Sequence, residues 1–268
     1  MPSSVPSKTS DLSPFQFACL ITAGYLAFGF FFFPHTTVAA GGRGGFWLII
    51  FDGFLAFLAL SGLLSLAKLL PQTPFECWGK PFLGRPALGI LSLLNGFYHI
   101  SLVVLDTALV SFILATLYMP HTPFWALSTP LIGVSLYIAR RGPVPIARVL
   151  QVTFIPVWIA TTLILLTGGI LLIRHPQLLV PAGPQWTPTF ASGILHQLLI
   201  FAGLQTVIPF FSLVQPHHAR QAARYARWGL VFVVILLLII YETVLATFGP
   251  SYTMLLRWPT ISFFRILT

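Results

Sequence analysis

Charged residues are scarce in this chain of 268 residues. Only 7% of the residues are charged and only five are acidic, whereas 57% are hydrophobic and the mean hydropathy is +0.91. A soluble domain typically carries about 25% charged residues. We therefore predict an all-α integral membrane protein, because a helix satisfies its own backbone hydrogen bonds in lipid.

Cysteine is equally scarce. Cys19 lies in the first apolar run and Cys77 in a polar connection. Two distant cysteines without a motif argue against a disulfide framework and against a metal site. The sequence also lacks a nucleophile–base constellation, a metal-ligand cluster and a phosphate-cradling glycine loop. We expect no cofactor, no metal and no enzymatic activity.

Basic residues outnumber acidic residues and give a net charge of +9. They are spread between apolar runs and do not form a basic surface interleaved with aromatic residues, so we expect no nucleic-acid partner. Such scattered charges are typical of the loops that fix the orientation of a membrane protein.

Seven apolar segments reach or approach the length of about 20 residues that a membrane-spanning helix needs. Pro- and Gly-rich or polar connections separate them, so residues 1–268 are predicted to form one transmembrane domain, with 1–14 as a tail and 258–268 as the start of an incomplete eighth helix. The predicted spans are approximately 15–37, 46–70, 87–118, 124–140, 149–174, 190–214 and 228–248.

Lys and Arg favour one side of these predicted spans. If the spans alternate in direction, only Arg43, Arg174 and Arg257 fall on the side opposite the N-terminus. Cytoplasmic loops carry the excess of Lys and Arg. The N-terminus is therefore predicted to be cytoplasmic.

One polar stripe interrupts the third span. Asn95, His99 and Asp106 are spaced four and seven residues apart, which places them on one helical face. Polar groups are costly in lipid, so this stripe is expected to face the protein interior. It is either a proton relay or polar lining of a cavity, or a set of interhelical hydrogen bonds.

Other polar residues within or beside the spans receive separate interpretations. Glu242 lies deep in the last predicted span and is a candidate for the same proton relay or polar lining. Asp52, near one end of the second span, and His196, near the start of the sixth, are interpreted as structural.

A basic segment, "QPHHARQAARYARWG", precedes the last span. Arg220, Arg224 and Arg227 recur at helical spacing, which favours an amphipathic helix on an anionic lipid surface. His217 and His218 are adjacent but lack a third ligand, so they are not interpreted as a metal site.

The first and sixth segments share an unusual pattern, "AFGFFFFP" and "IFAGLQTVIP". Each places a glycine, Gly29 or Gly203, in mid-span and a proline five or six residues later, which permits an interrupted helix. In transporters built from inverted repeats, interrupted helices at corresponding positions form the substrate site near the membrane midplane.

Six further motifs carry a resemblance to a known family. They are "GGFW", "LLPQTPFECWGKPFLG", "LYMPHTPFWAL", "ARRGPVPIARV", "FAGLQ" and "FGPSYTMLLRWPT". In this order and at these positions, the chain resembles the spore germination permeases, which are the B subunits of germinant receptors in the amino acid-polyamine-organocation superfamily. The resemblance extends over nearly the whole chain.

The resemblance implies a LeuT-type inverted-repeat bundle of about ten helices. This chain is then expected to be truncated after about seven to eight helices. In the superfamily, the first helix offers backbone amides to a substrate carboxylate, and the sixth contributes carbonyls and an aromatic ring. The candidate ligand-binding residues carried over are Ala27, Phe28, Gly29, Phe201, Gly203 and Gln205.

The implied function is a subunit in the cell membrane or the spore inner membrane that binds a small amino-acid-like germinant. It would signal germination through other germinant receptor subunits. Two alternatives stay open. One is a secondary transporter of amino acids or cations in which Asp106 and His99, or Glu242, carry a proton; the other is a truncated scaffold that binds no ligand.

Overall fold

The computed structural model describes residues 11–27, 31–69, 75–174, 183 and 188–267. Within these residues the chain is helical and has no strand; Leu12 and Val214 form an isolated β-bridge. The elements are α1 (Pro14–Ala27), α2 (Phe33–Gly41), η1 (Gly42–Gly44), α3 (Gly45–Leu69), α4 (Phe75–Leu117), α5 (Phe124–Ala139), α6 (Pro143–Arg174), α7 (Pro188–Gln197), η3 (Leu198–Thr206), α8 (Val207–Phe211), η4 (Pro216–His218), α9 (Ala219–Thr253) and α10 (Pro259–Leu267). The all-α prediction is confirmed.

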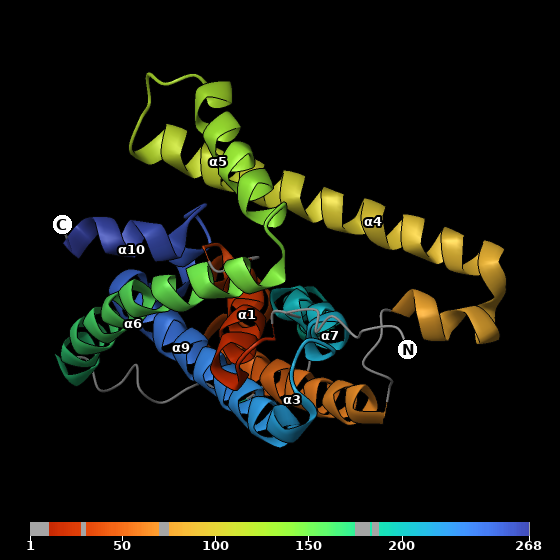
Figure 1. Cartoon of the computed structure of the whole chain (residues 1–268). Coiled ribbons are helices and arrows are strands. Elements are labelled where there is room, and N and C mark those ends of the chain that lie inside the picture. Colours follow the sequence, from red (N-terminus) through yellow and green to blue (C-terminus); the bar gives the residue numbers. More distant parts are fainter. Residues whose placement is uncertain (1–10, 28–30, 70–74, 175–182, 184–187, 268) are drawn as a thin grey trace, which may run out of the picture.

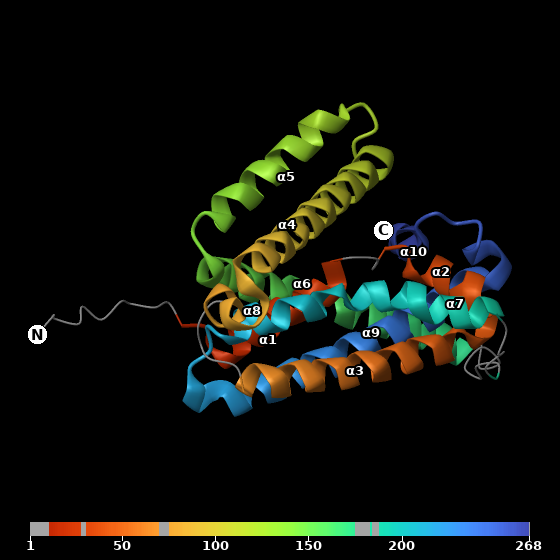
Figure 2. The same ribbon diagram turned by 90° about the vertical axis from the view of Figure 1, so that its right-hand side faces the viewer.

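The helices form a bundle with one hairpin standing apart from it. α1 packs against α9, η3 and α6, while α3 packs against α9, α8 and α7. The hairpin consists of α4 and α5, which pack on each other and extend away from the bundle in both views (Figures 1 and 2). The buried core therefore lies mainly between α1, α3 and α9 and the short helices of the sixth segment.

Three helical stretches among the described residues are long and apolar enough to cross a membrane. They are Phe33–Leu69, Gly84–Leu117 and Pro216–Thr253, and the shorter helix Phe124–Ala139 is also apolar. The arrangement of seven spans with a cytoplasmic N-terminus stays a prediction.

The connection before the third predicted span is helical from Phe75, although its prolines and glycines favoured a loop. The helical path breaks at Gly84, whose φ of 72° and ψ of 164° suit a residue without a Cβ. Gly249 has nearly the same conformation, φ 70° and ψ 163°, directly before Pro250. Both breaks are sharp bends between helical stretches.

The backbones of α1 and η3 meet directly at two glycines. A Cβ atom built on Gly24 would lie 2.9 Å from the Cα of Gly203, and one built on Gly203 would lie 2.7 Å from the carbonyl carbon of Gly24. No larger side chain fits either position without moving a backbone. Small residues allow this close approach in membrane proteins, where van der Waals packing drives helix association.

Replacing Gly24 by alanine should lower the free energy of unfolding by about 1–3 kcal/mol, because the added methyl group forces α1 and η3 apart. Thermal unfolding of the detergent-solubilised protein measures this change. Gly96→Ala is the matched control, since no atom lies within 4 Å of a Cβ built at that position. Equal stability of the two variants would contradict the close crossing.

Candidate ligand-binding site

The first segment is not one continuous helix. α1 ends at Ala27, Phe31 and Phe32 form a turn, and α2 begins at Phe33. This agrees with the interruption predicted from glycine and proline. Phe32 supplies no side-chain cap to α2, and Pro34 occupies its first turn. The N-terminus of α2 thus has no side-chain cap, although the amides of His35 and Thr36 already donate to the carbonyl of Phe32. The helix dipole at this end favours an anion.

The sixth segment is interrupted as well, but by a change of helix type. Between α7 and α8 lies η3, a 3₁₀ helix of nine residues, in which Phe201 departs from helical geometry at φ −92° and ψ 21°. Runs of 3₁₀ helix longer than three or four residues are uncommon. Pro209 contributes to this change, because it has no N–H to donate to the carbonyl of Gln205.

Two aromatic side chains join the interrupted segments. The rings of Tyr25, on α1, and Phe201, on η3, meet edge to face with centroids 5.9 Å apart. Both side chains are buried. The Tyr25 hydroxyl has no hydrogen-bond partner among the described residues. A buried hydroxyl without a partner is costly unless another group binds it.

The predicted ligand-binding residues have mixed outcomes. Phe28 and Gly29 lie outside the described residues, and Ala27 is the last residue of α1. Phe201 and Gly203 are buried and Gln205 is half-buried. Gly203 packs on the backbone of α1. It therefore fixes the crossing of the two segments, and its Cα faces no open space on that side.

A buried hydrogen bond links α2 to α7. The Gln197 amide donates to Thr37 Oγ1, which in turn donates to the carbonyl of Phe33 at 2.7 Å. Gln197 and Thr37 are 3% and 0% exposed. The sequence analysis missed this pair, because nothing in the local pattern distinguishes these residues from other polar residues near helix ends. His196, interpreted as structural, is exposed with its Nδ1 2.8 Å from the carbonyl of Ser192.

The acidic residues within the spans lie on three different helices. Asp52 is completely buried on α3, and neither carboxylate oxygen has a hydrogen-bond partner among the described residues. Glu242, on α9, is half-buried, and its Oε1 is also unpartnered within that part of the chain. Arg43 lies close enough to Glu242 to interact with it electrostatically. Asp52 is thus far more enclosed than its predicted place near one end of a span suggested.

The polar stripe of α4 does not face the interior of the bundle. Asn95 is exposed, and His99 and Asp106 are partly exposed. His99 Nδ1 lies 2.8 Å from the carbonyl of Asn95, a contact within the same helix. α4 packs mainly on α5 and stands away from most of the bundle, so the stripe lies on a different helix from Glu242 and outside the packing of α9 on α1 and α3 (Figure 1). The expected interior position is therefore wrong for Asn95, whereas Asp106 is half-buried and its Oδ1 is enclosed without a hydrogen-bond partner among the described residues.

The basic segment belongs to the long helix α9. Arg220, Arg224 and Arg227 lie in its first turns, and the helix continues without a break into its apolar part. Alanines on the other side of these turns are buried in the bundle: Ala222, Ala223 and Ala226. The segment is therefore packed against protein on one side and is not a separate helix on a lipid surface.

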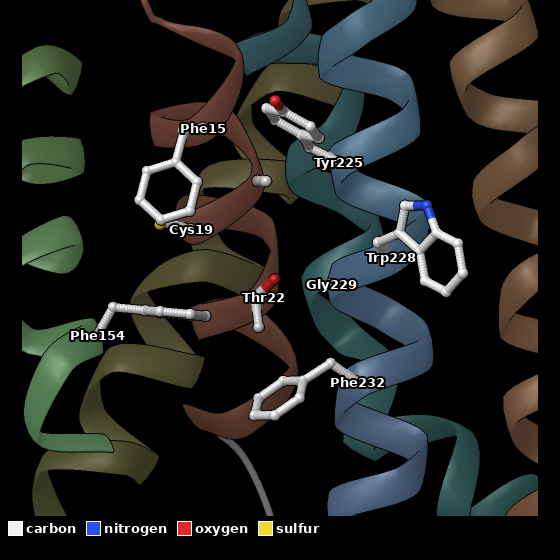
Figure 3. Close-up of a pocket in the computed structure, with 9 residues that line it drawn as sticks. Phe15, Cys19, Thr22, Phe154, Tyr225, Trp228, Gly229 and Phe232 are labelled. Atoms are coloured by element: carbon white, nitrogen blue, oxygen red, sulfur yellow. The ribbon is translucent and has the colours of Figure 1, made fainter. Parts of the chain in front are cut away.

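A cavity of about 550 Å³ lies elsewhere, between α1, α6 and α9 (Figure 3). Nearly all its lining residues are apolar or aromatic. None of the predicted ligand-binding residues lines it. No local sequence pattern predicts this cavity, because its side chains come from three helices that are far apart in the sequence.

Long apolar helices with many exposed hydrophobic side chains define an all-α integral membrane protein. The family model described as spore germination protein matches residues 11–268, so the chain belongs to this family of spore permeases. The family is named for spore germination and not for an enzymatic reaction.

A curated relative is the spore germination protein YndE of Bacillus subtilis (strain 168). It is 26% identical over 171 residues, which cover 63% of this chain and 47% of YndE. The chain thus spans about half the length of the curated relative that it matches. No solved structure matches the chain, so the LeuT-type inverted repeat stays a prediction.

Thr37→Val should destabilise the protein by about 1–2 kcal/mol, because the buried Gln197 amide loses its acceptor. Thermal unfolding in detergent measures the loss. Thr36→Val is the matched control: Thr36 Oγ1 also donates to the carbonyl of Phe33, at 2.9 Å, but no bond to another helix is involved. A control variant as unstable as Thr37→Val would show that the link between α2 and α7 contributes nothing.

Proposed function

We propose that this protein is a membrane subunit of a spore germinant receptor and binds a small amino-acid-like molecule. The binding site lies where the first and sixth segments are interrupted. The observation that carries this proposal is their direct packing: α1 lies on η3 and α2 lies on α7, so that both interruptions belong to one region. Membership of the spore germination protein family supports the biological role.

The chemistry of this region suits an amino acid. The family resemblance assigns the carboxylate to backbone amides of Ala27, Phe28 and Gly29, and the positive end of the α2 dipole would favour it there. The Tyr25 hydroxyl would bond a polar ligand atom, and Phe201 would form an apolar wall. Carbonyl groups of η3 and the Gln205 side chain are the proposed acceptors for the ammonium group.

The proposed location is the cell membrane or the spore inner membrane, with the N-terminus in the cytoplasm. The distribution of Lys and Arg supports this orientation. The proposed partners are the other germinant receptor subunits, which would receive the signal. The polar stripe of α4 supports a protein neighbour, because lipid does not solvate these side chains.

A second candidate function is secondary transport of an amino acid or cation. The specific observation that favours it is the buried, unpartnered carboxyl group of Asp52, with Glu242 on a neighbouring helix. Acidic groups within spans are typical of proton relays. In this alternative they would exchange protons as the substrate crosses the membrane.

Ligand binding is tested by thermal unfolding of the detergent-solubilised protein with a panel of amino acids. One or a few of them should raise the unfolding temperature, because a ligand stabilises the state that it binds. Tyr25→Phe should remove at least half of this shift while leaving the unliganded protein equally stable.

Tyr252→Phe is the matched control, because it removes the same hydroxyl group from an exposed tyrosine. It should keep the full ligand-induced rise in unfolding temperature. Gly203→Trp is unsuitable as a binding-site variant, since its side chain would separate α1 from η3. A folded protein that no amino acid stabilises would contradict the proposal and favour a scaffold without ligand.

Receptor and transporter are distinguished by uptake of the stabilising amino acid, radiolabelled, into liposomes that contain the protein. A receptor should give no net uptake above protein-free liposomes. Accumulation driven by an imposed proton gradient, and lost in Asp52→Asn, would instead establish transport. Asp11→Asn, an exposed acidic residue outside the predicted spans, is the control for a general effect of lost charge.

A further inference from the structure

The cavity between α1, α6 and α9 is an apolar groove with one polar end. Figure 3 shows side chains from all three helices turned toward it, with the Tyr225 hydroxyl near one end and Phe232 toward the other. The lining residues are Phe15, Ala18, Cys19, Thr22, Phe154, Tyr225, Trp228, Gly229 and Phe232.

The floor of this groove is the contact between α1 and α9. Cys19 and Thr22 are both 1% exposed and lie deepest. Gly229 lets α9 approach Thr22 closely, because a Cβ at this position would overlap the threonine side chain. Because Gly229 has no side chain, α9 can pack closely on α1. Gly229 also leaves room for the groove that it lines.

Aromatic rings form the sides of the groove. Phe154 contacts Phe15 and Phe232, with ring centroids 6.2 and 6.4 Å apart, and these three rings make a continuous apolar wall. Trp228, on α9, is 66% exposed. The groove therefore opens to the surroundings of the bundle, which in a membrane are lipid chains.

Positive charge gathers at the Tyr225 end. The Arg224 guanidinium lies 5.9 Å from the centre of the Tyr225 ring, and Arg220 lies one turn earlier; both are exposed. The Tyr225 hydroxyl accepts a hydrogen bond from Gln221 at 2.9 Å. Asp11 accepts a hydrogen bond from the Gln215 amide at 2.5 Å. Residues 215–241 contain no acidic side chain.

We propose that this groove binds one anionic phospholipid, with an acyl chain along the aromatic wall and the phosphate beside Arg224. Charge complementarity favours this occupant. A lipid without net charge would gain less from the arginines, and free phosphate has no apolar part to fill the groove. Arginine side chains bind phosphate oxygens by charge-assisted hydrogen bonds, and basic residues next to spans attract anionic lipids. The inference does not depend on the proposed germinant site.

The test is quenching of Trp228 fluorescence by lipids brominated on the acyl chain, added to the full chain in detergent micelles. The Trp228 signal is the difference between each protein and the same protein carrying Trp228→Phe. Brominated phosphatidylglycerol should reach half-maximal quenching at a mole fraction about five-fold lower than brominated phosphatidylcholine, the effect of about one interfacial arginine.

Two variants separate the headgroup contact from the groove. Arg224→Gln, which changes an exposed side chain, should abolish the preference for phosphatidylglycerol. Arg257→Gln, in the connection between α9 and α10, should preserve it. Ala18→Phe should reduce quenching by phosphatidylglycerol, because the larger ring fills the groove. Thermal unfolding checks that each variant is folded.

Equal quenching of Trp228 by both lipids in the unmodified protein would overturn the proposal and identify ordinary lipid contact. Preference for phosphatidylglycerol that persists undiminished in folded Ala18→Phe would also overturn it, since it would show a general surface-charge effect without a bound acyl chain. Preference that survives in Arg224→Gln would exclude the assigned phosphate position.

Discussion

The direct contact of Gly24 with Gly203 is the constraint on which the rest of the candidate site depends. It brings the backbone of α1 against η3. At that separation Tyr25 reaches Phe201. Further along the same segments, α2 lies close enough to α7 for Gln197 to bond Thr37. A membrane gives no hydrophobic driving force between helices, so close packing of small residues must supply much of their association.

Among the buried polar side chains, those without a hydrogen-bond partner are better functional candidates than those that have one. Backbone and side-chain polar groups in lipid need partners within the protein. The Gln197 amide donates a hydrogen bond to Thr37, and the Tyr241 hydroxyl donates one to the carbonyl of Gly42. Tyr25 and Asp52 are the contrast, because they are buried without a partner among the described residues. These two groups are therefore available for a ligand or a proton.

Long helix α9 combines several roles along its length. Its first turns carry exposed arginines on one side and buried alanines on the other. Gly229 then brings it against α1, and Glu242 lies further along, near Arg43. α9 thus supplies one side of the proposed lipid groove and also carries Glu242, while it packs on α3.

The sequence by itself determined that the protein is helical and embedded in a membrane, and that its first and sixth segments are interrupted. These properties follow from local features, namely apolar runs and the backbone limits of glycine and proline. Only the tertiary structure decided that Asn95 on α4 is exposed, that Asp52 is enclosed, and that Gln197 meets Thr37. Each of these depends on which helices pack together, and in a chain that is apolar on nearly every face, periodicity does not specify the neighbours.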